Sequence, residues 1–304
     1  MKNSTTDSSI LLVGATGYLG MEVCRQLMTT NRNVTALVRS TSAAEKVNAL
    51  KQMGAKIVEG DLKDITSIKK VLNGITKVIS TASSTISSQA GDNIQTVDNE
   101  GQINLVDSAE ASGVSQYIFV SIPPMTGEFP LQTAKRKVEN KITASKIAYT
   151  ILQPSFFMEA WLSPMIGFDF PNAKATIYGE GKNKISWIAL HDVAAFVVAS
   201  LENPAARNKK LQLGGPEALS PLEVVALFEK AGNKKFNLQH VPVEALQAQQ
   251  KGAPDDLGKS FASLMLAYAS GSEINMNETL KAFPLKLTTL SEYAMQMSQI
   301  SQAV

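Results

Sequence analysis

Short apolar runs alternate with longer amphipathic segments through the first half of the chain. Six runs rich in Val, Ile and aromatic residues lie at Ile10–Val13, Asn33–Val38, Lys56–Val58, Lys77–Ser80, Tyr117–Val120 and Tyr149–Leu152. Such continuous runs are typical of strands that are buried on both faces. The segments between them carry apolar residues at the spacing of one helix face, as in Ile65, Ile68 and Leu72. This alternation predicts βαβ units and a parallel sheet with helices on both faces.

The second half of the chain is less regular. Pro and Gly residues interrupt 155–184, so no long element is expected there. We expect a helix over 191–201 capped by Asp192, and a strand over 210–213. A further helix is predicted from Pro221 to about Lys230, because Ser220 and Glu223 have the spacing of a capping box. From residue 236 onward we expect helices and loops without the rhythm of the sheet.

The strongest motif follows the first predicted strand. Gly14, Gly17 and Gly20 are spaced GxxGxxG, one residue longer than the dehydrogenase pattern GxGxxG. A dinucleotide site needs this strand–loop–helix context, in which glycines allow a tight turn, close approach of a pyrophosphate and close helix packing. The residues predicted to bind the cofactor are Gly14, Thr16, Gly17, Tyr18, Leu19 and Gly20. The alternative is a glycine-rich turn without a ligand.

The ends of the second and third predicted strands bear on the choice of cofactor. An NAD site usually has an acid after the second strand, whereas this chain has Arg39 and Ser40. Because an arginine can bind a 2′-phosphate through two hydrogen bonds, we predict NADP(H), with a solvated arginine as the alternative. After the third strand, Asp61 can accept a hydrogen bond from the adenine amino group and Leu62 can pack on the ring. Asp61 can equally cap the next helix.

Aromatic residues are concentrated just beyond the last of the six runs. Seven of them lie at Phe156, Phe157, Trp161, Phe168, Phe170, Tyr178 and Trp187. Flat aromatic walls suit a planar apolar substrate, for which we predict Phe157 and Trp161 as contacts, with Met125 as a further wall. The alternative is that these rings fill a second core. We expect several to be core and only two or three to face a ligand.

Composition excludes several classes of function. The 29 Lys and Arg residues nearly balance the 27 Asp and Glu residues, so no basic excess indicates nucleic acid or an anionic membrane surface. One cysteine, Cys24, excludes a disulfide framework, and we expect it to be buried and inert; with two histidines, no metal site is assigned. No apolar run approaches the roughly 18 residues of a membrane span, and residues 1–10 lack the apolar stretch of a secretory signal. We therefore expect a cytoplasmic protein.

Taken together, these motifs resemble a known family. The glycine loop, VRS at 38–40, EGDL at 59–62, ISTASS at 79–84 and the Lys135–Glu139 spacing are similar to the atypical short-chain dehydrogenase/reductases. The NmrA-like group, with its isoflavone-reductase-like and NADPH:quinone-reductase-like proteins, is the most similar. The stretches 148–161, 191–204 and 211–225 extend the resemblance to about residue 245.

The pattern and the resemblance together imply an α/β fold, a Rossmann-type doubly wound parallel sheet with a smaller C-terminal α+β substrate lobe. The NADP-binding domain is expected to cover 1–154 and about 185–214, and the lobe 155–184 and 215–304. By motif, the resemblance implies further cofactor contacts at Thr81, Ala82, Ser83, Lys135, Pro154, Phe156 and Phe157. It also implies that Lys135 holds the nicotinamide ribose and that Ser121 lies near the nicotinamide, which makes these two the candidate catalytic residues.

One departure from the family pattern affects the chemistry. Short-chain dehydrogenases usually place a proton-donating Tyr four residues before the active Lys, and this chain has Leu131 there. Hydride transfer belongs to the cofactor, so it does not depend on that Tyr. The proton then comes from Lys135, from Ser121 through water, or from solvent. A quinone or enone, which accepts hydride to give a stabilised oxyanion, needs only weak proton donation.

Two functions from different classes follow. The first is an NADPH-dependent oxidoreductase that transfers hydride to a small planar electrophile such as a quinone or enone. The alternative is a non-catalytic NADP(H)-sensing regulatory protein that binds a protein partner, which the missing Tyr leaves open. Lys135 and the aromatic residues favour the enzyme, and the sequence does not indicate an oligomeric state.

Overall fold

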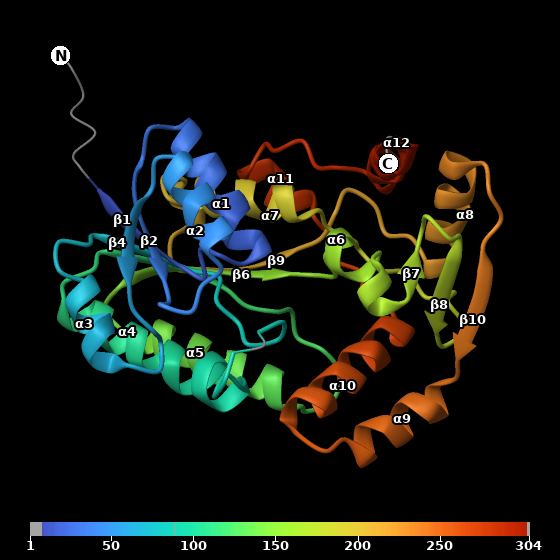
Figure 1. Cartoon of the computed structure of the whole chain (residues 1–304), viewed down its shortest axis with the longest axis horizontal. Helices are drawn as coiled ribbons and strands as arrows, with labels where there is room; N and C mark the ends of the chain where they lie inside the picture. The colour runs from blue at the N-terminus through green and yellow to red at the C-terminus, as the bar shows by residue number, and fades with distance from the viewer. Residues whose placement is uncertain (1–7, 88, 303–304) are drawn as a thin grey trace. The chain divides into compact units, whose positions relative to one another are not determined.

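The six apolar runs form six strands of a seven-stranded sheet in a computed structural model that describes residues 8–87 and 89–302 (Figure 1). The strand order is β3-β2-β1-β4-β5-β6-β9, and the pairings from β3 to β6 are parallel. The strands are β1 Ser9–Val13, β2 Asn33–Val38, β3 Lys56–Glu59, β4 Lys77–Ser80, β5 Gln116–Val120, β6 Ala148–Pro154 and β9 Lys209–Leu213. The predicted Rossmann-type sheet is confirmed.

Helices cover both faces of this sheet, as the alternating pattern predicted. Figure 1 shows α1 (Tyr18–Thr29) and α2 (Ala44–Gln52) on one face. The other face carries α3 (Ile65–Val71), α4 (Gln102–Ala111) and α5 (Pro130–Ala144). The core on that second face joins buried strand residues to buried helix residues, among them Leu11, Val78, Phe119, Val106 and Val138. The apolar side of these helices therefore packs against the sheet.

Two features of this half differ from the prediction. Strand β3 is half-exposed rather than buried, because it lies at the edge of the sheet and has a neighbour on one side only. A π-helix, η1 (Ile94–Gly101), precedes α4, and a capping box between Asn93 and Thr96 starts it. Among its buried residues only Ile94 and Val97 are apolar side chains of any size, beside Asp98, Asn99 and Gly101, so the apolar pattern did not indicate it.

The chain divides into two compact units, which alternate along the sequence. The first comprises residues 1–121, 131–152 and 194–211, and the second comprises 122–130, 153–193 and 212–304. The helix α7 (Leu190–Ser200) passes from the second unit into the first. Whether the second unit binds a substrate stays a prediction.

The second unit has a small sheet of its own, in the order β10-β8-β7. Its strands are β7 Phe168–Asp169, β8 Lys174–Tyr178 and β10 Asn237–Val241, and its helices are α6 Met158–Trp161, α8 Pro221–Gly232, α9 Val243–Gly252, α10 Asp256–Ser270, α11 Asn277–Ala282 and α12 Leu290–Gln302. Short 3₁₀ turns lie at Pro164–Ile166 in this unit and at Pro204–Ala206 in the first. The strand β10 corrects the expectation of helices and loops after residue 236; it has few apolar residues, and pairing with β8 holds it in place.

Local signals in the second unit had mixed outcomes. Helix α8 begins as predicted, with a capping box between Ser220 and Glu223. Asp192 does not cap α7: it lies inside the helix, and its carboxylate accepts hydrogen bonds from the backbone N–H and hydroxyl of Thr288 at 2.8 and 3.1 Å. The reason is burial, since a carboxylate at 2 % exposure needs donors, and Thr288 supplies them.

Three further observations concern expectations drawn from composition. Cys24 is fully buried as expected, and burial raises the pKa of its thiol to about 11. None of the helices within residues 8–87 and 89–302 is long and apolar enough to cross a membrane. In the same part of the chain, no three His, Cys, Asp or Glu side chains gather to hold a metal ion. Residues 1–7, on which part of the secretory argument rested, lie outside the described residues.

Candidate functional site

The glycine loop has the geometry that its spacing predicted. Gly14 has φ +82°, the left-handed region, and its carbonyl accepts a hydrogen bond from the N–H of Gly17 at 3.0 Å. A Cβ on Gly14 would lie 2.7 Å from the backbone nitrogen of Ala82. A Cβ on Gly20 would lie 2.1 Å from the carbonyl oxygen of Gly14. The tight turn and the close helix packing are thus confirmed, and side chains at either position are sterically excluded.

Five of the predicted site residues, each from the end of a different strand, lie at one edge of the sheet. Gly14, Arg39, Asp61, Thr81 and Ser121 follow the carboxyl ends of β1 to β5. Because these strands are parallel, their carboxyl ends share one edge, which is where open α/β sheets bind ligands. The link is direct between the first and fourth strands, since the N–H of Thr81 donates to the carbonyl of Val13 at 3.0 Å.

Lys135 forms a buried ion pair in the first unit. Its ammonium lies 3.1 Å from Oδ1 of Asp98, and the two side chains are 5 % and 0 % exposed. The ammonium also lies 5.2 Å from the centre of the Phe119 ring. Ser84 donates to Oδ2 of Asp98 through its N–H at 2.9 Å and its hydroxyl at 2.6 Å. Burial alone would raise the pKa of the Asp98 carboxyl, but the charge of Lys135 and the Ser84 hydrogen bonds outweigh it and hold the pKa low.

Asp98 and Ser84 were not among the residues predicted from the sequence. The available signal was an acid within the otherwise apolar face that Ile94 and Val97 begin, since an acid there needs a cationic partner. Few apolar residues mark that face in the sequence, and the identity of the partner depends on the tertiary fold.

Ser121, the other candidate catalytic residue, is tied to a second buried carboxylate. Its hydroxyl donates to Oε1 of Glu139 at 2.6 Å. The ammonium of Lys210 lies 2.9 Å from Oε2, and Arg136 also pairs with Glu139, whose side chain is 1 % exposed. The single hydroxyl proton of Ser121 is therefore directed at Glu139, so towards a ligand this oxygen is an acceptor. This arrangement favours Lys135 or solvent over Ser121 as the source of a proton.

The end of β2 holds a charged cluster that includes Arg39. The guanidinium of Arg39 and the ammonium of Lys63 both form ion pairs with Asp92, whose side chain is 1 % exposed. Ser87 also donates to this carboxylate. Burial would raise the pKa of Asp92, but the hydrogen bonds from Lys63, Ser87 and Arg39 outweigh it and lower the pKa.

Asp61 takes part in the same cluster but does not cap a helix. Its Oδ2 lies 3.6 Å from the ammonium of Lys63, and its Oδ1 accepts from the N–H of Lys63 at 2.9 Å. The cap of α3 is Asp64, which accepts from the N–H of Thr66. The interpretation of Asp61 as a helix cap is therefore wrong. The cap is Asp64, three residues later, because α3 begins further from the end of β3 than expected. Leu62 is buried in the core beneath the sheet.

Most of the predicted aromatic residues in the second unit are core. Phe156, Phe168, Phe170, Tyr178 and Trp187 are buried, whereas Phe157 and Trp161 are half-buried. Several of the rings are therefore core, as expected, and the prediction that Phe157 and Trp161 face a ligand stays a prediction.

The ring of Trp161 is held on two sides. It stacks on Tyr268 at 5.6 Å and meets the edge of Phe156 at 4.7 Å between ring centres. Met125 packs partly buried against the same cluster. Tyr268 was not predicted, because it lies about a hundred residues further along the chain. Phe156 is only 2 % exposed, which favours the core interpretation for this ring, and Pro154 ends β6.

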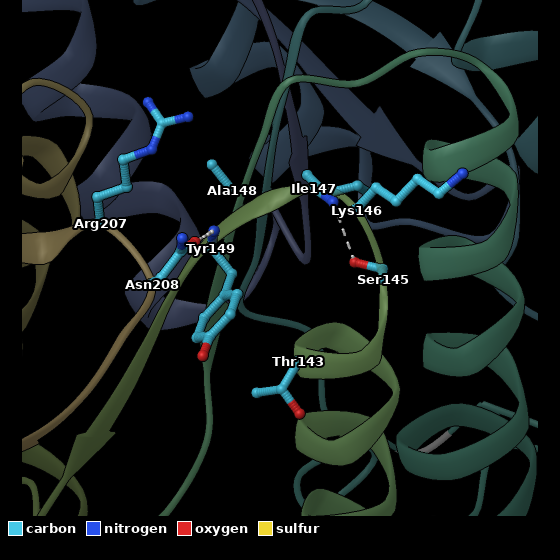
Figure 2. Close-up of a pocket in the computed structure, with 8 residues that line it drawn as sticks. All are labelled: Thr143, Ser145, Lys146, Ile147, Ala148, Tyr149, Arg207 and Asn208. Atoms are coloured by element: carbon cyan, nitrogen blue, oxygen red, sulfur yellow. Dashed lines mark hydrogen bonds between the residues drawn. The ribbon is translucent and has the colours of Figure 1, made fainter.

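A shallow pocket of about 250 Å³ lies at the other edge of the sheet, where β6 begins (Figure 2). Its lining includes Lys146, Tyr149, Arg207 and Asn208. Figure 2 shows Arg207 extending upward on the left and Lys146 extending to the right, so the two charged ends lie apart in this view. The lining of this pocket includes none of the predicted site residues.

The parallel sheet with a glycine loop after its first strand defines a Rossmann-type protein. Residues 6–294 match the NmrA-like family, and the chain belongs to that family. The resemblance that the motifs indicated is thus confirmed over nearly the whole chain.

The relatives of this chain differ in what their names describe. The chain is 28% identical to the photosystem II assembly factor Ycf39 of Trieres chinensis, covering 95% of this chain and 92% of that protein. It is 29% identical to an NAD(P)H azoreductase of Xenophilus azovorans, covering 84% and 85%. The NADPH-dependent quinone oxidoreductase of Escherichia coli, solved with NADPH, has a TM-score of 0.75 at 24% identity, covering 95% and 99%. That last likeness shows the fold.

Proposed function

We propose that this protein is an NADP(H)-dependent reductase that transfers hydride to a small planar electrophile such as a quinone or enone. The observation that carries the proposal is the buried Lys135, held by Asp98 in the unit that contains the glycine loop. A buried ammonium that a carboxylate orients is suited to hold vicinal hydroxyls. The names of the azoreductase and quinone reductase relatives support the same class of reaction.

The residues present fit a dinucleotide. The cradle that Gly14 and Gly20 form cannot accept side chains, and the N-terminus of α1 follows it with its N–H groups. When bound, NADP(H) supplies the hydride. The residues that would hold it are Gly14, Thr16, Gly17, Tyr18, Leu19, Gly20, Arg39, Ser40, Asp61, Leu62, Thr81, Ala82, Ser83, Pro154, Phe156 and Phe157. Of these, Phe156 and Leu62 are buried hydrophobic residues and act by shaping the walls.

Each remaining residue has a defined task in this proposal. Lys135 donates hydrogen bonds to the nicotinamide ribose, and Asp98 holds that ammonium in place. Phe157, Trp161 and Met125 form apolar walls for a planar substrate. Leu131 is 3 % exposed, so the position of the usual Tyr is occupied by core. The proton for the product oxyanion therefore comes from Lys135 or from solvent, which suits quinones and enones better than simple ketones.

NADPH oxidation against a panel of quinones and enones tests this function. The key variant is Lys135→Met combined with Asp98→Asn, because removing both charges leaves neither one buried alone. Lys137→Met, on the exposed side of the same helix, is the matched control. We expect turnover to fall at least 100-fold in the double variant, since misplacing a reacting group by about 1 Å has that effect, and to stay unchanged in the control. Turnover that survives in the double variant would contradict the assignment of Lys135.

The second candidate function is a non-catalytic regulator or assembly factor that senses NADP(H) and binds a protein. Leu131 in place of the proton-donating Tyr favours it, and so does the name of the Ycf39 relative. This function predicts NADPH binding without oxidation by any acceptor in the panel. A cytoplasmic location also stays a prediction, since one relative is named as chloroplastic.

A further inference from the structure

Two cations at the end of β2 share one buried acid. Arg39 and Lys63 have side chains 29 % and 27 % exposed, and both pair with Asp92, which is 1 % exposed. Lys63 comes from the segment after β3, and Asp92 from the segment that leads into η1. Three separate parts of the first unit therefore converge on this carboxylate.

The charges of this cluster cancel. Arg39 and Lys63 contribute two positive charges, and Asp92 and Asp61 contribute two negative ones, with Asp61 3.6 Å from Lys63. A phosphate monoester carries a charge of about −1.5 to −2 at neutral pH and binds through charge-assisted hydrogen bonds to such cations. A phosphate that reaches Arg39 and Lys63 therefore competes with a carboxylate that is already there.

We propose that Asp92 is a specificity-determining residue, which occupies the two cations of a 2′-phosphate subsite, and that Lys63 is the second cation of that subsite. This inference rests on the proposed NADP(H) function. The preference for NADPH over NADH is then set by a balance, in which Arg39 and Lys63 attract the 2′-phosphate and Asp92 weakens their hold on it.

The geometry makes Asp92 a suitable competitor. Its carboxylate is almost fully covered, while the cations are partly exposed, so a ligand meets the cations first. Asparagine has the same shape as aspartate, and its amide oxygen can still accept the hydrogen bond of Ser87. Asp92→Asn therefore removes the charge and preserves the packing.

Fluorescence titration of NADPH and NADH against the wild type, Asp92→Asn and Lys63→Met tests the proposal. We expect Asp92→Asn to tighten NADPH binding on the order of tenfold, the effect of one charged hydrogen bond, with NADH unchanged. Lys63→Met should weaken NADPH binding several-fold, again with NADH unchanged. Lys70→Met, an exposed lysine on α3, is the matched control and should alter neither titration.

The outcomes separate this inference from the proposed function. Weaker NADPH binding by Asp92→Asn would show that Asp92 positions the cations instead of competing for them, and would overturn the proposal. Equal changes for NADPH and NADH would overturn it as well. A wild type that binds neither cofactor would overturn the proposed function, and the inference with it. Circular dichroism of each variant keeps a folding defect from being taken for a change in affinity.

Discussion

Lys135 and Asp98 compensate each other's charge at a place from which water is almost excluded. Removing one partner of a buried pair costs about 3–5 kcal/mol, because the other charge is left without compensation. We therefore expect Lys135→Met and Asp98→Asn each to lower the free energy of unfolding by that amount. The double variant should recover a large part of the loss, which urea unfolding would measure. Losses that simply add would show that the two side chains do not interact.

The acid side of the stability profile should depend on the same carboxylate. The pKa of Asp98 is lowered from its ordinary value of 3.8 in the folded protein. A depressed folded pKa stabilises the protein above the unfolded value, and that contribution is lost as the pH falls through the folded value. Unfolding measured between pH 7 and pH 3 should therefore show a steep loss below about pH 4 in the wild type. Asp98→Asn should show a shallower loss, and identical slopes would contradict the assignment.

Single residues differed in how far the sequence could place them. Gly14 and Gly20 were predictable, because their roles depend on backbone geometry within a few residues. Lys135 was found through the spacing of a family motif. Asp98 and Asp92 were not, because their roles depend on cations that lie 37 and 53 residues away and that only the tertiary fold brings near.

At the scale of elements, helix α1 packs closely against the glycine loop at Gly20. A Cβ there would lie 2.1 Å from the carbonyl oxygen of Gly14, so the backbone of the loop or of the helix would have to shift. Gly20→Ala should therefore shift α1, weaken NADPH binding at least tenfold and destabilise the protein. Gly252→Ala is the matched control, since no atom lies within 4 Å of its Cβ position. That change should leave binding intact, and thermal unfolding with NADPH titration would check both variants.

Some elements could be predicted from local signals, whereas others depend on the whole fold. Helix α8 carries its own start signal in Ser220 and Glu223, and the structure has it there. Strand β10 has no apolar run, and pairing with β8 makes it a strand. Strand β3 was predicted as a strand, but its half-exposure was not, because its place at the edge of the sheet is a property of the whole fold.

For the whole molecule, cofactor binding should appear as added stability. A ligand that binds only the folded state at 100 times its dissociation constant stabilises by about 2.7 kcal/mol. NADPH should therefore raise the melting temperature more than NADH does at equal concentration, because of Arg39 and Lys63. Arg39→Asp should abolish that difference. Equal shifts for the two cofactors in the wild type would remove the basis for predicting NADP(H).

The alternation of the two units along the chain has a consequence for how the protein is made on the ribosome. The first unit needs residues 194–211, which include most of β9, so it cannot close until about two thirds of the chain has emerged. The second unit must wait longer, because the buried carboxylate of Asp192 receives its hydrogen bonds from Thr288, near the end of the chain. Until then a nascent chain holds an unsatisfied acid in a half-formed core. Neither unit can be cut out as one continuous fragment, and a stop codon before residue 288 should yield a protein that chaperones retain or proteases remove.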